Sequence, residues 1–125
     1  MVTARRIKVL LVDDHLMFRQ GLRSLLQSYP DIDVVDEASD GAEAVSKVSE
    51  AQPAVVVMDI SMPKMDGVAA TRLLKSQHAQ VTVLGLSVTG QGYQVEAMLK
   101  AGAVKVLTKE KAVDELYDSI KQVTA

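Results

Sequence analysis

Residues 54–59 read Ala-Val-Val-Val-Met-Asp, an uninterrupted apolar run that ends on a carboxylate. A short β-branched run after Pro53 predicts a strand over 54–58 that is buried on both faces of a parallel sheet. Comparable short runs, rich in β-branched or apolar residues, occur at 7–12, 33–37, 81–86 and 104–107. The chain therefore carries five predicted strands, and a carboxylate follows the third directly.

Longer segments with apolar residues at helical spacing follow each predicted strand. The apolar residues of these segments lie within 18–29, 45–48, 70–74, 95–99 and 113–123. Turn-forming residues mark boundaries at Pro63–Gly67 and Ala101–Ala103. The alternation predicts one α/β domain over residues 1–125, built from five strand–helix units. Such units give a parallel sheet with right-handed crossovers and helices on both faces.

The composition excludes several classes of protein. The chain has 125 residues, of which 48% are apolar and 24% charged, which is typical of one water-soluble globular domain. A net charge of -2 supplies no basic surface for direct nucleic-acid binding, and three Tyr and one Phe give no base-stacking platform. The absence of Cys excludes disulfides and thiolate zinc sites. No run resembles a membrane span or a secretory signal, so we expect a cytoplasmic protein.

Polar residues that can bind ligands or take part in a reaction follow four of the five predicted strands. Asp13 and Asp14 follow the first strand, Asp59 the third, Ser87 the fourth and Lys109 the fifth. Ligands of open parallel sheets bind outside the carboxyl ends of the strands, which is where these side chains are expected. The residues after the second strand indicate nothing definite.

Three carboxylates on neighbouring strands repel one another, so either one takes a proton or a cation lies among them. Oxygen ligands without Cys favour a hard ion such as Mg²⁺. Two acids in the first strand–helix turn also exclude flavodoxin-like FMN binding, which needs bare N–H groups there. With Mg²⁺ and Lys109, the charges of the acids are balanced. Attack by the Asp59 carboxylate on a phosphoryl group, which Ser87 and Lys109 would help to hold, fits this balance.

Each residue taken alone also has an ordinary structural interpretation. Asp14 would be an N-cap of the first helix, and Lys109 would be a surface lysine. His15 is expected at the start of that helix, with Met17 and Phe18 packed in the core or in a groove. The functional hypothesis therefore rests on the joint arrangement of acids, hydroxyl and lysine at the ends of the strands.

Four stretches resemble the response-regulator receiver domain of bacterial two-component signalling, and the resemblance covers essentially the whole chain. They are Val9–His15, Asp59–Gly67, Leu86–Ser87, and Ala101–Ala103 leading to Lys109. Residues 13–23 further resemble the subfamily whose output domain is a LuxR-type helix-turn-helix. The resemblance implies a flavodoxin-like fold with strand order 2-1-3-4-5.

The resemblance also implies the roles of the site residues. Asp59 would accept a phosphoryl group from a His of a sensor histidine kinase, and Ser87 and Lys109 would bind that group. Mg²⁺ would be held by the side chains of Asp13, Asp14 and Asp59 and the backbone carbonyl of Ser61. The domain would be a regulatory phosphoacceptor rather than an enzyme, with only slow self-phosphorylation and dephosphorylation. The resemblance is also compatible with a phosphorylation-dependent homodimer.

The subfamily resemblance implies that the 125 residues are the receiver portion of a longer transcription regulator. Its DNA-binding output domain would lie beyond Ala125, and this chain alone would not bind nucleic acid. Three positions depart from the family pattern: Val106 replaces an aromatic residue, Val88 replaces a small residue and could crowd the phosphoryl site, and Glu110 replaces a Pro. Because Val106 cannot make the inward rotation of an aromatic ring, we expect the segment after Ser87 to report phosphorylation instead.

Two other classes of function remain open at this point. An Asp-nucleophile phosphatase of the haloacid dehalogenase type uses Asp, Mg²⁺ and Lys, but it needs a second Asp where this chain has Ser61. A receiver-like scaffold would bind partners without being phosphorylated, and the intact set of acids disfavours it. Turnover of a phosphomonoester would support the first alternative, and failure to react with a small acyl phosphate would support the second.

Overall fold

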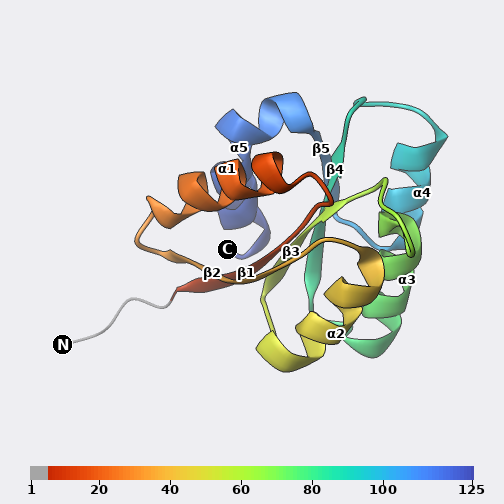
Figure 1. Ribbon diagram of the computed structural model, residues 1–125, viewed down its shortest axis with the longest axis horizontal. Helices are drawn as coiled ribbons and strands as arrows, with labels where there is room; N and C mark the ends of the chain where they lie inside the picture. The colour runs from red at the N-terminus through yellow and green to blue at the C-terminus, as the bar shows by residue number, and fades with distance from the viewer. Residues whose placement is uncertain (1–5) are drawn as a thin grey trace.

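One parallel sheet organises the structure, a computed structural model that describes residues 6–125 (Figure 1). The strands are β1 (Ile7–Val12), β2 (Ile32–Ala38), β3 (Val55–Asp59), β4 (Thr82–Ser87) and β5 (Lys105–Thr108). They are arranged in the order β2-β1-β3-β4-β5, and every neighbouring pair is parallel. The expected strand order of the flavodoxin-like fold is confirmed.

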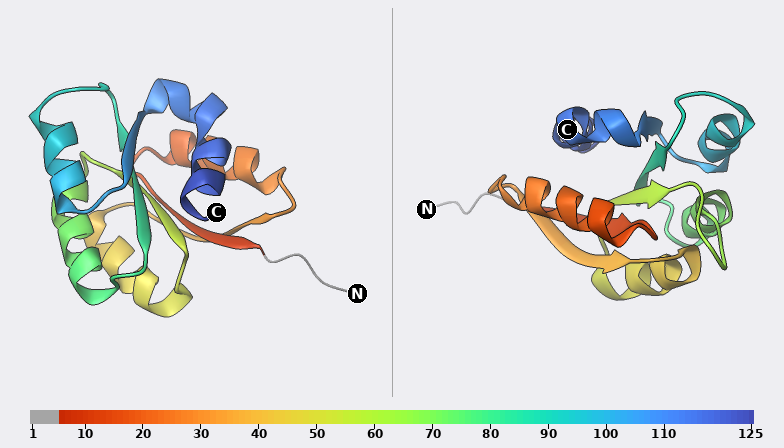
Figure 2. Two further views of the ribbon diagram at one scale, coloured as in Figure 1. Left: turned by 180° about the vertical axis from the view of Figure 1, so that it is seen from behind. Right: turned by 45° about the horizontal axis from the view of Figure 1, so that its top comes forward.

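Five helices cover the two faces of the sheet (Figures 1 and 2). They are α1 (Leu16–Gln27), α2 (Gly41–Ala51), α3 (Gly67–Gln77), α4 (Tyr93–Ala101) and α5 (Lys109–Val123). The helices α1 and α5 lie side by side on one face, and α2, α3 and α4 cover the other. This arrangement gives two apolar layers, one on each side of the sheet, as five strand–helix units predict.

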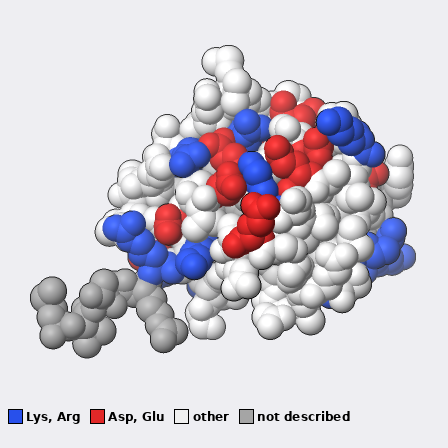
Figure 3. Space-filling view, turned by 60° about the horizontal axis from the view of Figure 1, so that its bottom comes forward, with Lys and Arg blue, Asp and Glu red and all other residues white. Residues whose placement is uncertain are grey.

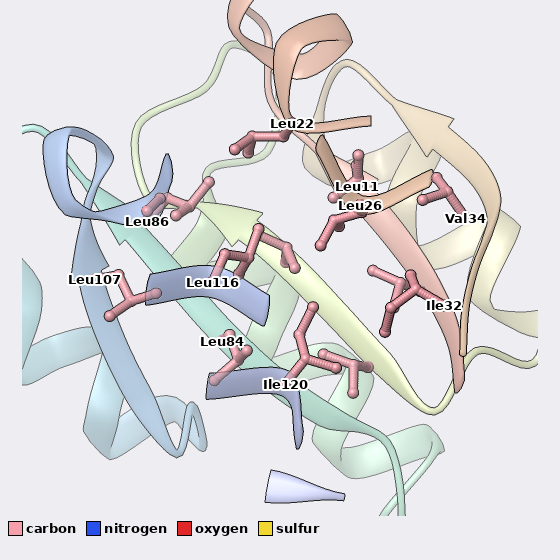
Figure 4. Packing of buried hydrophobic residues seen from close by; sticks show 14 residues of the cluster. Leu11, Leu22, Leu26, Ile32, Val34, Leu84, Leu86, Leu107, Leu116 and Ile120 are labelled. Carbon is pink, nitrogen blue, oxygen red and sulfur yellow. The ribbon is translucent and has the colours of Figure 1, made fainter. Parts of the chain in front are cut away.

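The central strand β3 contributes to both layers, which explains its continuous apolar sequence. Val55 and Val57 pack with the residues of α1 and α5, whereas Val56 and Met58 pack with those of α2, α3 and α4. All four side chains are fully buried. Figure 4 shows the first of these layers, in which leucines of α1 and α5 face those of β1 and β4. Full burial of each such side chain is worth about 1.5–3 kcal/mol relative to exposure.

The N-termini of the helices differ in how they are capped. The side chains of Asp40, Asp66 and Thr108 accept hydrogen bonds from backbone N–H groups in the first turns of α2, α3 and α5. His15 precedes α1 and Gly92 precedes α4, and neither provides a side-chain cap. The Asp14 side chain is therefore free for a role other than capping α1.

Sequence and structure differ in a few details. Asp59 and Ser87 are the last residues of β3 and β4 rather than the first residues after them. The expectation that Met17 packs in the core or a groove is wrong for the core, because its side chain is 86% exposed, while Phe18 is partly buried against the α1–α5 layer. Within residues 6–125, none of the helices combines the length and apolar character required to cross a bilayer.

Candidate functional site

The register of the sheet brings the predicted acids to one edge. Val12 of β1 pairs with Met58 of β3, so Asp13, directly after β1, lies beside Asp59, the last residue of β3. The backbone N–H of Asp13 donates to the carbonyl oxygen of Ala38 at 3.0 Å, which continues the pairing with β2. Two carboxylates that are distant in sequence are therefore fixed side by side by main-chain hydrogen bonds.

Both carboxylates are buried and share one cation. Asp13 is 1% exposed and Asp59 is 2% exposed, whereas Asp14 faces solvent. The Lys109 Nζ lies 2.8 Å from Asp13 Oδ2 and 3.3 Å from Asp59 Oδ2. Lys109 is the first residue of α5, directly after β5, which places its ammonium group at the same edge. The structure thus brings together three residues that the sequence had assigned to this site.

The electrostatic environment shifts the pKa of Asp59 upward. Burial and then the neighbouring Asp13 charge raise this pKa from 3.8 to about 6, although Lys109 acts in the opposite direction. Burial lowers the pKa of Lys109, but its contacts with Asp13 and Asp59 outweigh burial, and the pKa is raised overall. At neutral pH Asp59 is therefore mostly ionised beside a charged lysine.

One buried oxygen of this site depends on a single partner. Among residues 6–125, the side-chain group closest to Asp13 Oδ2 is the ammonium of Lys109, whose Nζ lies 2.8 Å away. Asp13, Asp14, His15 and Asp59 each offer a ligand atom, and these atoms all lie within 4.8 Å of one another. A buried carboxylate next to two more carboxylates, with one lysine as its cation, matches the oxygen ligands of Mg²⁺. The acidic cluster can therefore hold a divalent metal ion.

Ser61 and Ser87 lie at the same edge of the sheet. The backbone N–H of Ser61 points toward Asp59 Oδ1, with the nitrogen 3.4 Å from the oxygen. Ser87 is buried at the end of β4, next to β3, and its Oγ accepts a hydrogen bond from the backbone N–H of Thr89 at 3.2 Å. The Ser87 hydroxyl thus retains its own proton for donation to another acceptor.

Gly67 permits the close approach of α3 to the site. A Cβ atom at this position would lie 2.1 Å from the backbone oxygen of Asp59 and 2.8 Å from the Cα of Ile60. The Gly67 N–H also donates to the Ile60 carbonyl oxygen at 2.8 Å. Only glycine therefore allows the loop of residues 60–66 to fold back and bring Ser61 near Asp59.

A network of charged side chains that the sequence did not predict supports Asp13 from β2. Arg19 Nη1 donates to the Asp13 carbonyl oxygen at 2.5 Å, and Arg19 Nε donates to Glu37 Oε1 at 2.7 Å. Arg23 Nη1 donates to the other Glu37 oxygen. Burial alone would raise the pKa of Glu37, but the two guanidinium groups outweigh it and hold this pKa below its usual value. Arg19 therefore ties the backbone of Asp13 to the edge strand.

His15 is also part of the site, whereas the sequence indicated only the start of a helix. Its Nδ1 lies 3.1 Å from Asp13 Oδ1, 3.3 Å from Asp14 Oδ1 and 3.1 Å from Lys109 Nζ. Its backbone N–H donates to Asp13 Oδ1 at 2.7 Å. The sequence feature that could have identified His15 is its position directly after Asp13 and Asp14, because the turn that contains these residues folds back on Asp13.

A cavity opens beside the acids, between β4 and the starts of α1 and α5. It has a volume of about 520 Å³ and is lined by His15, Phe18, Val88, Lys109 and Glu110. The Lys109 Nζ lies 5.0 Å from the centre of the Phe18 ring, a cation–π distance. The Val88 side chain is 78% exposed at the rim of this cavity. A phosphorylated group can therefore approach the site from this side.

Comparisons with known proteins agree with this geometry. The model of the response regulator receiver domain family matches residues 9–121. The transcriptional regulatory protein DegU of Brevibacillus brevis is 39% identical over 122 residues, which cover 98% of this chain and 52% of that protein. The chain therefore spans about half the length of this curated relative.

Solved structures are similar as well. The response regulator domain of Thermotoga maritima CheB superposes with a TM-score of 0.86 at 34% identity, covering 94% of this chain and 96% of that one. A two-component response regulator of the LuxR family from Aurantimonas sp. SI85-9A1 gives a TM-score of 0.88 at 31% identity, covering 94% of this chain and 84% of that one. Fold and sequence thus point to the same group of proteins.

Proposed function

We propose that this chain, which belongs to the response regulator receiver domain family, works as a switch in which Asp59 is the phosphoacceptor. The observation that carries the assignment is the burial of Asp59 beside Asp13, with Lys109 as the one compensating cation among residues 6–125. Burying two carboxylates with one cation costs folding free energy. Such an arrangement is typical of functional sites, here one that binds a further cation and a phosphoryl group.

Asp59 is the nucleophile in this proposal. Its pKa of about 6 leaves the carboxylate mostly ionised at neutral pH, as attack on phosphorus requires. A new bond forms between an Asp59 oxygen and phosphorus, while the bond between phosphorus and the donor nitrogen breaks. The electron pair of that bond goes to the imidazole of a phosphohistidine on a sensor histidine kinase. The product is an acyl phosphate on Asp59.

Asp13, Asp14, Asp59 and the backbone carbonyl of Ser61 would hold Mg²⁺. The bound ion would supply positive charge to the phosphoryl oxygens and lower the repulsion between the carboxylates. Asp13 keeps its place through Arg19 and the pairing with β2, so its oxygens need little rearrangement. Asp14 is exposed and adds charge from the solvent side.

Lys109 and Ser87 would bind the phosphoryl group. Lys109 Nζ already contacts Asp59 Oδ2 and can transfer this contact to a phosphoryl oxygen as the carboxylate charge is lost. Ser87 keeps a free hydroxyl proton on the neighbouring strand. A move of Ser87 toward the phosphoryl group would carry the segment after β4 with it, which couples the chemistry to a change in shape.

The full-length protein would be a transcription regulator with a DNA-binding output domain beyond Ala125. Support comes from the DegU relative and from the LuxR-family regulator that shares the fold. On the face drawn in Figure 3, Lys and Arg side chains lie among those of Asp and Glu over most of the surface. We therefore expect no direct nucleic-acid binding by this chain, and phosphorylation would act through the output domain or through a homodimer.

Phosphorylation by acetyl phosphate tests the proposal. Incubation with acetyl phosphate and Mg²⁺ should add the mass of one phosphoryl group to the intact chain. Asp59→Asn should abolish this addition, and Asp14→Ala should slow it sharply. Asp31→Asn is the matched control, because this partly buried acid precedes β2 at the opposite end of the sheet and should label normally. Full labelling of Asp59→Asn would overturn the assignment.

A further inference from the structure

The ammonium group of Lys109 lies over an aromatic ring beside the acids. Its Nζ is 5.0 Å from the centre of the Phe18 ring, a distance at which a cation and an aromatic face attract each other. Both residues line the cavity of about 520 Å³ next to the site. The Lys109 side chain is 15% exposed, and such shielding from water strengthens the attraction. Phe18 therefore contacts a residue of the site, in addition to the packing that its sequence position indicated.

The Phe18 ring is the fixed member of this pair. It is partly buried against the apolar layer between the sheet and the helices α1 and α5. It also lines an apolar groove of about 290 Å³ together with Leu22, Leu25 and Val113. Lys109, in contrast, carries its ammonium group on a flexible four-carbon stem. A ring that is packed in place can therefore restrict where this ammonium group lies.

The ring differs in kind from the carboxylates that contact Lys109. The Lys109 Nζ lies 2.8 Å from Asp13 Oδ2 and 3.3 Å from Asp59 Oδ2. In the proposed function Asp59 loses its negative charge when it accepts the phosphoryl group, so its attraction for Lys109 falls. The Phe18 ring is uncharged and takes no part in this chemistry. Its attraction for the ammonium group is therefore the same before and after phosphoryl transfer.

We propose that Phe18 is a positioning residue that keeps the Lys109 ammonium group beside Asp59 while its contact passes from the carboxylate to a phosphoryl oxygen. The inference rests on the proposed function and extends it to a residue that touches no reacting atom. Holding the ammonium group in place lowers the entropy that must be lost during transfer, since a free lysine side chain explores many rotamers. Loss of the ring should therefore slow phosphorylation of Asp59.

Three variants separate the ring contact from packing in the groove. Phe18→Leu keeps an apolar side chain but removes the ring. Phe18→Tyr keeps the ring, and the partial exposure of this position leaves room for the hydroxyl. Leu25→Ala is the matched control, because Leu25 lines the groove but not the cavity that contains Lys109. The measurement is the rate of phosphoryl addition from acetyl phosphate at saturating Mg²⁺, followed by intact mass.

We expect Phe18→Leu to slow labelling by roughly five- to thirtyfold, the factor that corresponds to loss of a shielded cation–π contact. Phe18→Tyr should restore the rate to within about twofold of the unaltered chain, because a Tyr face also binds cations. Leu25→Ala should label like the unaltered chain. An unchanged rate in Phe18→Leu, or an equal loss in Leu25→Ala, would overturn the inference.

Fluorination of the ring tests the contact with little change in shape. Because Phe18 is the one phenylalanine of the chain, biosynthetic incorporation of fluorinated phenylalanine alters this ring alone. Fluorine withdraws electron density from the ring face and so weakens its attraction for a cation. Labelling should slow stepwise from the native ring through the monofluoro and difluoro to the trifluoro derivative. Equal rates across the series would overturn the inference, because a ring that serves only as packing gives no such trend.

Lysine resonances report the contact without a phosphoryl donor. The Hε protons of Lys109 should resonate upfield of those of the other lysines, because they lie next to an aromatic face, and Phe18→Leu should remove this displacement. The displacement should persist when Mg²⁺ and beryllofluoride, a phosphoryl mimic, are added. Its absence in the free chain, or its loss with beryllofluoride, would overturn the inference.

These outcomes are distinct from failure of the proposed function. Full labelling of Asp59→Asn would remove the phosphoacceptor assignment itself. Labelling that is confined to Asp59 and independent of the Phe18 ring would remove the role of Phe18 alone.

Discussion

At the carboxyl end of the sheet, Asp13 and Asp59 are buried with one lysine between them. At the amino end, Asp31 lies just before β2, where Lys121 Nζ is 2.7 Å from its Oδ2 and the Tyr117 hydroxyl donates to the same carboxylate at 2.9 Å. The pKa of Asp59 is raised by burial and by Asp13, whereas the Lys121 hydrogen bond and then the Tyr117 hydroxyl outweigh burial and lower the pKa of Asp31. Asp31 thus has a lysine and a tyrosine hydroxyl for itself, whereas Asp13 and Asp59 share one lysine.

Cavity size alone would not have distinguished the two ends. A cavity of about 540 Å³ lies at the amino end, slightly larger than the 520 Å³ cavity beside the acids. Its lining contains no Asp, Glu, Lys or Arg: Val48, Gln52, Pro53, Ala54, Gln77, His78, Gln80 and Val81. Buried charge with incomplete pairing, rather than volume, marks the functional end of this sheet.

The largest expected effect is an opposite pH dependence of stability at the two ends. The folded state raises the pKa of Asp59 from 3.8 to about 6, so its contribution is most favourable below pH 3.8 and is lost as the pH rises to about 6. In EDTA at pH 8, Asp59→Asn should therefore raise the free energy of unfolding by on the order of 3 kcal/mol. Urea unfolding across this pH range measures the effect.

The matched variant at the amino end should behave in the opposite way. Asp31 has a lowered pKa in the folded state, so its contribution is present above its unfolded value of 3.8 and is lost as the pH falls through the folded value. Asp31→Asn should therefore destabilise the chain at pH 8, with a difference that shrinks toward acid pH. If both variants changed stability in the same direction at pH 8, the contrast between the ends would be refuted.

Most of the fold follows from the sequence because the apolar runs are unambiguous. The predicted strand at 81–86 differs from β4 by one residue at each end, and the strand at 54–58 differs from β3 in the same way. These shifts occur because the register continues through Asp59 and Ser87, polar residues that hydrophobicity alone leaves outside a strand. The positions of the acids followed from the rule that strand ends meet at one edge.

Contacts between elements distant in sequence were not predictable in the same way. Glu37 indicated nothing definite in the sequence, because its role depends on α1 crossing β2 so that Arg19 and Arg23 reach it. Met17 was expected in the core or in a groove, yet the rotation of α1 that buries Leu22 and Leu26 keeps it out of the core, and it lines a surface groove instead. His15 joins the site only because the turn before α1 folds back on Asp13.

A smaller change in the free energy of unfolding should show which arginine holds Asp13 in place at the carboxyl end of the sheet. Arg19 is 13% exposed and bonds both the Asp13 carbonyl and Glu37, whereas Arg23 is 38% exposed and bonds only Glu37. Arg19→Met should lower the free energy of unfolding by about 2 kcal/mol, the cost of leaving charged and backbone acceptors unpaired. Arg23→Met should cost about 0.5 kcal/mol.

The same pair of variants separates support of the site from support of the fold. Arg19→Met should also weaken Mg²⁺ binding, measured by calorimetry, because Asp13 loses one of its two links to β2 and keeps only the backbone hydrogen bond to Ala38. Arg23→Met should leave Mg²⁺ binding nearly unchanged, because Arg23 does not contact Asp13 within the described chain. Equal Mg²⁺ affinities in both variants would mean that Arg19 stabilises the sheet edge only.

The smallest expected effect concerns which part of the carboxyl end changes shape. Gly92, before α4, has φ 113° and ψ 175°, a conformation that is essentially restricted to glycine. Val106, in contrast, is partly buried against the α2–α4 layer, and its Cγ2 would lie 3.1 Å from a Cβ built on Gly85. Movement is therefore easier in the segment 88–92 than in β5.

Hydrogen exchange with and without beryllofluoride, a phosphoryl mimic, checks this expectation. Amide protection should change between Val88 and Met98, and it should stay constant in β5 and at the amino end, in segments 52–54 and 78–81. Gly90→Ala together with Gly92→Ala should reduce the response while Asp59 still labels, since alanine at position 92 costs about 1–3 kcal/mol in the present loop conformation. A response confined to β5, with 88–98 unchanged, would contradict the expectation and would make Val106 part of the switch despite its short side chain.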